Sequence, residues 1–324
     1  MMELISNYGL FLAKLVTVAI IVMVVVGFIV TSARRGAQQD GRDVENLNKR
    51  FDNLGDAVRR AVHGKARLKK DSKERRKDDK QQEKIGSQRQ RVFVLDFKGD
   101  VRATATASLR EEISAVLAVA TKEDQVLLRL ENAGGTVHEH GLAASQLARI
   151  KDRDIPLIVS VDKVAASGGY LMACVGDRIL AAPFAIIGSI GVIAQLPNFH
   201  RLLEEKGVDF EQITAGRYKR TLTLFGKNTD EGREKLKEEL EEVHEIFKNQ
   251  ILEHRSEINL DQVATGEHWF GMRAMELQLV DEIRTSDDFL LEATKEFDIY
   301  KVTYKRRRPF PERLMSGMDS LLSR

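Results

Sequence analysis

The sequence is poor in cysteine, with Cys174 as the single one among 324 residues. An internal disulfide is therefore excluded, and no histidine or cysteine stands near Cys174 at the spacing of metal ligands. The formal net charge is also small, at +2, so the composition gives no reason to expect a nucleic-acid partner. We expect a protein that needs neither a metal nor another cofactor, with Cys174 as a small core residue.

Charge is missing from one long stretch near the start of the chain. Residues 9–31 are apolar except for Lys14, and the part from Leu15 to Val30 has no charged side chain. This length matches the roughly 20 residues that a membrane-spanning helix needs. We predict a short tail over residues 1–8 and a single-pass helix over residues 9–31 that contacts lipid. A cleaved signal peptide is the alternative, but its apolar region is usually shorter.

Large apolar side chains are scarce between residues 32 and 91. Residues 33–91 contain 19 Lys or Arg and 10 Asp or Glu, so this stretch cannot bury a core and we predict a charged stalk. Its first part is expected to be helical and to self-associate, because apolar residues recur at alternating spacings of three and four. These residues are Val44, Leu47, Phe51, Leu54, Val58 and Ala61. The basic run over residues 65–84 is expected to be a solvated spacer, with contact to anionic lipid head groups or to nucleic acid as the alternative.

From residue 92 to residue 297, short apolar runs alternate with helical periods, which predicts one α/β domain with a mostly parallel sheet. Expected strands cover residues 92–97, 125–130, 156–161, 178–182, 190–194 and 210–214. Expected helices cover residues 108–120, opened by a capping box of Ser108 and Glu111, then 140–151, 171–175, a segment after Pro197, and 230–254. Residues 179–196 lack charge, but proline and glycines interrupt them, so buried strands are preferred over a second membrane span. Residues 298–324 are expected to form a basic tail.

Ser167 is the first candidate for chemistry, because it follows an expected strand and precedes an expected helix. This position exposes a hydroxyl at the end of a strand, and the small neighbours Ala165, Ala166, Gly168 and Gly169 leave room for a substrate backbone. The start of the helix also provides free N–H groups that can stabilise an oxyanion. Taken alone, the same pattern is more typical of a helix-capping serine.

A second glycine pair, Gly134-Gly135, also follows an expected strand. Acyl transfer needs two N–H donors that converge on the carbonyl oxygen, and the obvious pair is one N–H from Gly134 or Gly135 and one from Gly168. A plain tight turn would explain the glycines as well. Two glycine-rich strand ends occur in one series of alternating strands and helices, and one of them has a serine. Together they indicate an active site more strongly than either glycine-rich turn does alone.

These residues resemble the S49 family of bacterial membrane serine peptidases, and more closely its SohB branch. The likeness extends over nearly the whole chain and rests on six motifs. They are V-F-V-L-D-F-K-G at Val92 to Gly99, E-N-A-G-G at Glu131 to Gly135, V-D-K-V-A-A-S-G-G-Y at Val161 to Tyr170, P-F-A-I-I-G-S-I-G-V at Pro183 to Val192, A-G-R-Y-K-R-T-L-T at Ala215 to Thr223, and A-T-G-E-H-W at Ala264 to Trp269. The family commonly has N-S-P-G-G or E-S-P-G-G at the second motif, so the missing proline bears on the shape of that loop.

The resemblance implies a ClpP/crotonase-like fold and an endopeptidase with a Ser/Lys dyad. Ser167 is then the nucleophile and Lys219 the general base, and the N–H groups of Gly134 and Gly168 form the oxyanion hole. A lysine accepts the serine proton only in its neutral form. Family members also complete a site with nucleophile and lysine from neighbouring subunits, which implies a homo-oligomer. Expected substrates are extended peptides, such as signal peptides or misfolded envelope proteins.

The resemblance further implies a bacterial inner-membrane protein whose catalytic domain faces outward. The arginines after the apolar run predict a cytoplasmic domain instead, by the positive-inside rule. Other readings of the site also stay open at this stage. Lys163 and Lys227 are alternative bases, and a Ser-His-Asp triad would use a histidine. The histidines concerned are His138, His140, His200 and His268, and Ser189 is an alternative nucleophile. A silent membrane scaffold and an acyl-CoA enzyme on the same fold are the alternative functions.

Overall fold

The computed structural model describes residues 14–17, 23, 41–62 and 89–304. The chain divides into two compact units, one of Met1–Arg42 with Lys305–Arg324 and one of Asp43–Tyr304. Most of the expected membrane helix, the basic run over residues 65–84 and residues 305–324 of the expected tail lie outside the described residues. Within the described part of the chain, no helix has the length and apolar character needed to cross a membrane. The fold described below is that of the unit Asp43–Tyr304.

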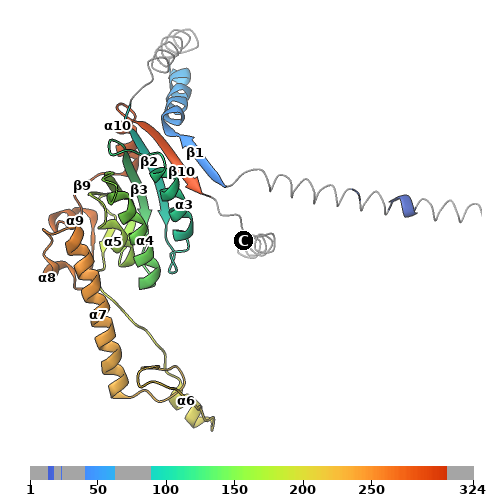
Figure 1. The fold of residues 1–324 in the computed structure, drawn as a ribbon, viewed down its shortest axis with the longest axis vertical. Helices are drawn as coiled ribbons and strands as arrows, with labels where there is room; N and C mark the ends of the chain where they lie inside the picture. Colours follow the sequence, from blue (N-terminus) through green and yellow to red (C-terminus); the bar gives the residue numbers. More distant parts are fainter. Residues whose placement is uncertain (1–13, 18–22, 24–40, 63–88, 305–324) are drawn as a thin grey trace, which may run out of the picture. The chain divides into compact units, whose positions relative to one another are not determined.

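A seven-stranded sheet forms the centre of this unit (Figure 1). Its strand order is β1 (Arg42–Asn46), β10 (Asp298–Tyr304), β2 (Arg91–Lys98), β3 (Gln125–Glu131), β4 (Leu157–Val161), β6 (Arg178–Ala181) and β9 (Glu282–Ile283). From β10 to β9, every neighbouring pair is parallel. The prediction of an α/β domain with a mostly parallel sheet is therefore confirmed.

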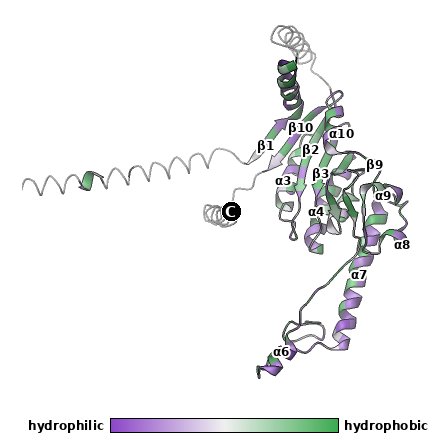
Figure 2. Cartoon of the chain, turned by 180° about the vertical axis from the view of Figure 1, so that it is seen from behind, coloured by the Kyte–Doolittle hydropathy of each residue, from purple (hydrophilic) through white to green (hydrophobic). Residues whose placement is uncertain are grey.

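Strand β2 shows why apolar side chains fill this sheet on both faces. Phe93, Leu95 and Phe97 point to one face, where they pack in a large core with helices α3 (Thr106–Leu117) and α4 (Val137–Lys151). Val92 and Val94 alternate with them and belong to a second core on the other face. Side chains of a strand alternate between faces, so a central strand between two helical layers is apolar at nearly every position. Figure 2 shows this hydrophobic sheet beside the more hydrophilic α7.

The second core extends into the segment for which we expected a stalk. Leu47 is buried there and Phe51 packs against it, both from the helical residues 47–62, together with side chains of α10 (Ser286–Ala293). Residues 298–304, expected in the tail, form β10 inside the sheet. The folded unit thus exceeds residues 92–297 at both ends, because β10 needs a neighbour on its outer edge and β1 supplies one.

A second, three-stranded sheet is separate from the main one. It consists of β5 (Val164–Ala166), β7 (Ile186–Gly188) and β8 (His268–Phe270), with β5 and β7 parallel and β7 and β8 antiparallel. Helix α5 (Gly168–Ala173) follows β5 directly. The remaining short helices are α8 (Leu260–Val263) and α9 (Gly271–Glu276). Strands β6 and β7 cover residues 179–181 and 186–188 of the uncharged stretch 179–196, which agrees with the preference for buried strands over a second span.

Residues 189–229 leave the two sheets as an arm, and α7 (Asp230–His254) returns toward them (Figure 1). The arm contains one short helix, α6 (His200–Glu205). The strands expected at 190–194 and 210–214 do not form. Ile190 is buried in the core, whereas Ile193, Phe210 and Ile213 are exposed, Ile213 by 94%. No described strand pairs with either run.

The capping box expected at Ser108 and Glu111 is also wrong. Helix α3 begins at Thr106, and its N-cap residue is Ala105 without a side-chain cap. The carboxylate of Asp100 stabilises the turn before the helix, because it accepts hydrogen bonds from the N–H groups of Arg102 and Thr104. An aspartate in a turn competes well for such N–H donors, so the helix starts one turn earlier.

Candidate active site

Ser167 lies at the sharp turn between β5 and α5. Its N–H donates a hydrogen bond to Gly188 O of the neighbouring strand at 2.7 Å, which holds the end of β5 in place. The backbone of Ser167 has φ 53° and ψ −120°, a conformation that residues other than glycine rarely adopt. A strained strand-to-helix turn of this kind presents a nucleophile at the end of a strand. The predicted placement of Ser167 between a strand and a helix is confirmed.

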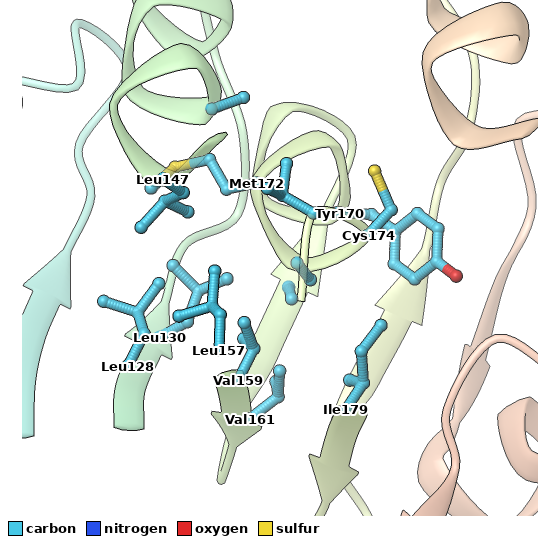
Figure 3. Close-up of a cluster of buried hydrophobic side chains, with 14 of the residues drawn as sticks. Leu128, Leu130, Leu147, Leu157, Val159, Val161, Tyr170, Met172, Cys174 and Ile179 are labelled. Carbon is cyan, nitrogen blue, oxygen red and sulfur yellow. The ribbon is translucent and has the colours of Figure 1, made fainter. Parts of the chain in front are cut away.

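Helix α5 is short, and buried side chains anchor it below Ser167. Tyr170, Met172 and Cys174 pack against the sheet residues of β3, β4 and β6 (Figure 3). The Tyr170 hydroxyl donates a hydrogen bond to Leu279 O at 2.9 Å. Burial raises the pKa of the Cys174 thiol to about 12, so this cysteine stays protonated and serves the core. The anchoring fixes the direction in which the first N–H groups of α5 point.

The loop after β3 lies directly against Ser167. Gly134 has a φ of +90°, and a Cβ at this position would lie 2.8 Å from Ser167 Cβ and 2.8 Å from Ala166 O. Only glycine allows so close an approach. Asn132 ties the loop to β5, since its O accepts a hydrogen bond from Ala166 N–H at 3.0 Å. The two glycine-rich strand ends therefore meet, as the sequence predicts.

The N–H groups of these glycines differ in what they bind. Gly134 N–H donates to Asn132 Oδ1 of its own loop at 2.9 Å. Among the described residues, the N–H groups of Gly135 and Gly168 have no hydrogen-bond partner. Both residues line the same cavity as Ser167. The donors that are free for a substrate oxygen are thus those of Gly135 and Gly168, whereas Gly134 N–H is occupied.

The cavity at Ser167 has a volume of about 590 Å³ and runs between α4 and α7. Near the serine its walls are small or apolar and include Ala144, Leu171 and Val192. Charged and polar side chains line it as well, namely Lys151, Asp152, Gln250, Glu253 and His254. A mostly apolar cleft with a few polar groups and a candidate nucleophile is the usual form of a ligand site.

Lys219 lies on the arm and is exposed. It lines a separate cavity of about 690 Å³ together with Phe210 and Ile213. In the described part of a single chain, Lys219 does not line the Ser167 cavity. The structure of one copy therefore brings together Ser167, Gly134, Gly135 and Gly168, and leaves the expected base apart from them.

The four histidines considered from the sequence do not supply an alternative base. His140 is fully buried beside the loop, and its Nδ1 and Nε2 face Thr136 O at 2.9 Å and Asn132 Oδ1 at 3.2 Å. Both ring nitrogens lie against these oxygens and not against Ser167, so His140 is not placed to accept the serine proton. His138 and His268 are exposed and His200 is on the arm.

The other candidates from the sequence are engaged elsewhere or exposed. Lys163 forms an ion pair with Glu131, with 3.0 Å between its Nζ and the carboxylate. Ser189 N–H donates a hydrogen bond at 2.6 Å to the O of Glu267, the residue before β8. Lys227 is exposed on the arm. No group of three or more His, Cys, Asp or Glu side chains within the described ranges is arranged to hold a metal ion.

Sequence reasoning missed the role of Asn132. Its side chain is 1% exposed and joins Gly134, His140 and Met172. The motif E-N-A-G-G contains an asparagine where a turn is expected, and a turn asparagine is usually exposed. Nothing in the sequence indicates that α4 and α5 close over it.

Comparison with known proteins gives consistent matches over the chain. The family model "Peptidase family S49 N-terminal" matches residues 3–147, and "Peptidase family S49" matches residues 149–300. The probable protease SohB of Haemophilus influenzae is 46% identical over 319 residues, which cover 94% of this chain and 90% of that protein. The probable protease SohB of Buchnera aphidicola subsp. Acyrthosiphon pisum is 46% identical over 323 residues, covering 99% and 96%. A solved structure of a mutant of the 1510-N membrane-bound stomatin-specific protease, in complex with a substrate peptide, aligns with a TM-score of 0.40 at 13% identity, covering 71% of this chain and 98% of that one.

Proposed function

The chain belongs to peptidase family S49, and from that premise we propose that it is a membrane-anchored serine endopeptidase with a Ser/Lys dyad. The observation that carries the proposal is the strained turn at Ser167, which shares one cavity with two free N–H donors. The two sheets, whose strands are mostly parallel and in which β5 leads to the serine, are compatible with a ClpP/crotonase-like fold. The anchor is the apolar run over residues 9–31.

In the proposed mechanism, Ser167 Oγ attacks the carbonyl carbon of a peptide bond. Lys219 Nζ accepts the serine proton and then delivers it to the leaving amine. The N–H groups of Gly135 and Gly168 stabilise the oxyanion in each tetrahedral intermediate. An acyl-enzyme on Ser167 forms when the amine leaves, and water hydrolyses it with Lys219 as the base.

Lys219 reaches the serine from a neighbouring copy of the chain in this proposal. Two observations support that arrangement. Lys219 is exposed on an arm that projects from the sheets, and the same arm exposes large apolar side chains such as Ile213 and Phe210. Exposed apolar side chains in a cluster are typical of a surface that another protein covers. The active site is then complete only in a homo-oligomer.

The substrates proposed are extended peptides, including signal peptides and misfolded envelope proteins. The cavity along α4 and α7 supports this class, because its apolar wall beside Ser167 suits an apolar side chain. Its polar groups Lys151 and Glu253 suit the backbone or charged groups of a longer peptide.

Labelling with a fluorophosphonate, followed by hydrolysis of a fluorogenic peptide, tests the proposal. The wild type should be labelled and active, and Ser167→Ala should lose both properties. Lys219→Ala should lose peptide hydrolysis by at least about 10³-fold, since a base that activates the nucleophile is removed. Ser189→Ala is the matched serine control and should keep labelling and activity. Labelling that persists in Ser167→Ala would refute the nucleophile, and full activity in Lys219→Ala would refute the base.

A further inference from the structure

Asn132 and His140 form a buried polar pair between the two candidate oxyanion donors. Asn132 is 1% exposed and His140 is 0% exposed, and the pair makes no contact with solvent. Buried polar side chains are costly unless each group is bonded, so a pair kept at this depth needs an explanation. Their hydrogen bonds lead to the glycine loop, β5, α4 and α5.

The asparagine side chain joins the loop to two helices. Asn132 Oδ1 accepts a hydrogen bond from Gly134 N–H at 2.9 Å and lies 3.2 Å from His140 Nε2 on α4. Its Nδ2 donates to Met172 Sδ on α5 at 3.4 Å. The backbone of Asn132 adds two bonds to β5, from its N–H to Val164 O at 2.9 Å and from Ala166 N–H to its O at 3.0 Å. One residue thus connects the glycine loop to β5, α4 and α5.

The hydrogen-bond directions in this pair follow from chemistry. Gly134 N–H can only donate, so the oxygen of the Asn132 amide has to face it. His140 Nε2 lies close to that same oxygen and donates to it in the tautomer that carries the ring hydrogen on Nε2. In this tautomer His140 donates to Asn132, and Asn132 fixes Gly134.

The imidazole also touches the second donor. A Cβ on Gly168 would lie 2.5 Å from His140 Cγ, so the ring packs directly on the Gly168 backbone. On its other side, Nδ1 faces Thr136 O at 2.9 Å at the end of the glycine loop. The ring therefore fills the space between the loop with Gly135 and the helix start with Gly168.

From these contacts we infer that Asn132 and His140 are positioning residues, which hold the N–H groups of Gly135 and Gly168 at the spacing that an oxyanion requires. The inference rests on the proposed peptidase function, and it assigns to this pair no contact with the reacting atoms. Oxyanion donors have to lie within a few tenths of an ångström of their productive positions, so they depend on rigid packing and hydrogen bonds from the residues around them. A misplacement of about 1 Å can cost about 10²-fold in rate.

Three variants test the inference in the full-length protein. Asn132→Leu removes the acceptor for Gly134 N–H and His140, and His140→Phe keeps a ring but removes both bonds. His140→Gln retains an N–H donor toward Asn132. In Asn132→Leu and His140→Phe, we expect kcat to fall about 10- to 100-fold while KM changes by less than about twofold. His140→Gln should recover part of kcat.

Two peptide inhibitors separate positioning from substrate binding. A peptide aldehyde adds to Ser167 and places an oxygen in the oxyanion hole, whereas the corresponding peptide alcohol does not. The inhibition constant of the aldehyde should rise in parallel with the loss of kcat, and that of the alcohol should stay unchanged. Asn48→Leu is the matched control, because the Asn48 amide makes a part-buried pair of hydrogen bonds, to Phe297 O and from Ile299 N–H, on the opposite face of the sheet. This variant should lower the melting temperature without changing kcat.

Unchanged kcat in both Asn132→Leu and His140→Phe would overturn the inference. A His140→Gln variant as inactive as His140→Phe would also overturn it, because the hydrogen bond to Asn132 would then be irrelevant. If the leucine variant fails to fold, His140→Phe and His140→Gln decide the matter alone. Failure of the proposed function looks different, since either the wild type would then hydrolyse no peptide or hydrolysis would persist in Ser167→Ala.

Discussion

At the scale of single residues, the active site depends on a backbone that passes very close to a side chain. Gly134, with φ +90°, leaves no space for a Cβ beside Ser167 Cβ. Gly134→Ala should therefore push the loop away from the serine and reduce kcat by about 10²-fold. Peptide hydrolysis and fluorophosphonate labelling rates measure the effect.

Gly266→Ala is a suitable control for this substitution. Gly266 has a similar φ of +86°, but nothing lies within 4 Å of its would-be Cβ. Both alanine variants should lose about 1–3 kcal/mol of stability from the unfavourable φ. Only Gly134→Ala should lose activity, and equal losses of activity in the two variants would show that backbone strain alone is responsible.

A second residue-scale prediction concerns Glu112 on α3, which makes stability depend on pH. Its carboxylate is buried and accepts a hydrogen bond from Tyr304 N–H at 2.7 Å. Burial, aided by the nearby charge of Asp96, raises the pKa of Glu112 from 4.5 to about 7. The folded protein then binds this proton more tightly than the unfolded chain. The contribution is complete below pH 4.5 and is lost as the pH rises through 7.

Glu112→Gln keeps an acceptor for Tyr304 N–H but removes the titration. We expect the free energy of unfolding of the wild type to fall by up to about 3 kcal/mol between pH 4.5 and pH 7, and this slope to be nearly absent in the variant. Urea denaturation at several pH values measures it. Glu111→Gln, on the solvent side of the same helix, should retain the wild-type slope. A slope that survives in Glu112→Gln would assign the effect to other groups.

The residues of the site could be predicted where their placement depends on the neighbouring sequence, and could not where it depends on the packing of distant segments. Ser167 and Gly168 stand in a strand-to-helix turn that the sequence pattern marks, and the meeting with Gly134-Gly135 follows from parallel strands that end at one edge. The occupation of Gly134 N–H by Asn132 depends on a side-chain rotamer inside the loop. Burial of His140 against Gly168 depends on how α4 packs, which no local pattern contains.

At the scale of elements, the helix after β1 has apolar residues at alternating spacings of three and four. Those at its start are buried in the core, and those at its end are exposed to solvent. Leu47 is 3% exposed, whereas Leu54 is 58% exposed. Leu47→Ala should lower the free energy of unfolding by about 2–4 kcal/mol, because it opens a cavity under β10. Leu54→Ala should change it by less than about 0.5 kcal/mol. Chemical denaturation of the two variants compares them directly, and equal effects would contradict the assignment of residues 47–51 to the core.

Elements with two buried faces were easy to predict from the sequence. Strands β2, β3 and β4 are mostly apolar and are interrupted in their interiors at Asp96, Arg129 and Ser160. Helix α7 is not buried on two faces, but its helical period is also clear. Hydropathy does not say what lies beside a segment, however. The apolar runs at 190–194 and 210–214 resemble strands but have no edge to pair with, and β1 is too charged to look like a strand although β10 offers it an edge.

At the scale of the whole molecule, the arm exposes a large set of apolar side chains. They are Ile193, Leu196, Phe199, Leu202, Val208, Phe210, Ile213, Leu224 and Phe225. A monomeric protein seldom leaves such a cluster in water. Lys219 belongs to the same arm, so a surface that buries the arm against a second copy also moves this lysine out of water. Assembly and the formation of the active site would then be a single event.

Co-expression of two inactive variants tests whether neighbouring copies share a site. If Ser167 of one copy works with Lys219 of the next, a ring assembled at random from equal amounts of Ser167→Ala and Lys219→Ala has about a quarter of its sites intact. Such mixed assemblies should recover about a quarter of the wild-type activity. If both residues come from one chain, every site lacks a partner and the mixture stays inactive.

The reverse mixture makes the same distinction by loss of activity. Wild type co-expressed with an equal amount of the Ser167→Ala/Lys219→Ala double variant should keep about a quarter of its sites when they are shared, and about half when they lie within one chain. Active-site titration with a fluorophosphonate alongside peptide hydrolysis separates the number of reactive serines from the number of complete dyads. A quarter in both mixtures fits shared sites alone, because sites within one chain give none in the first mixture and half in the second.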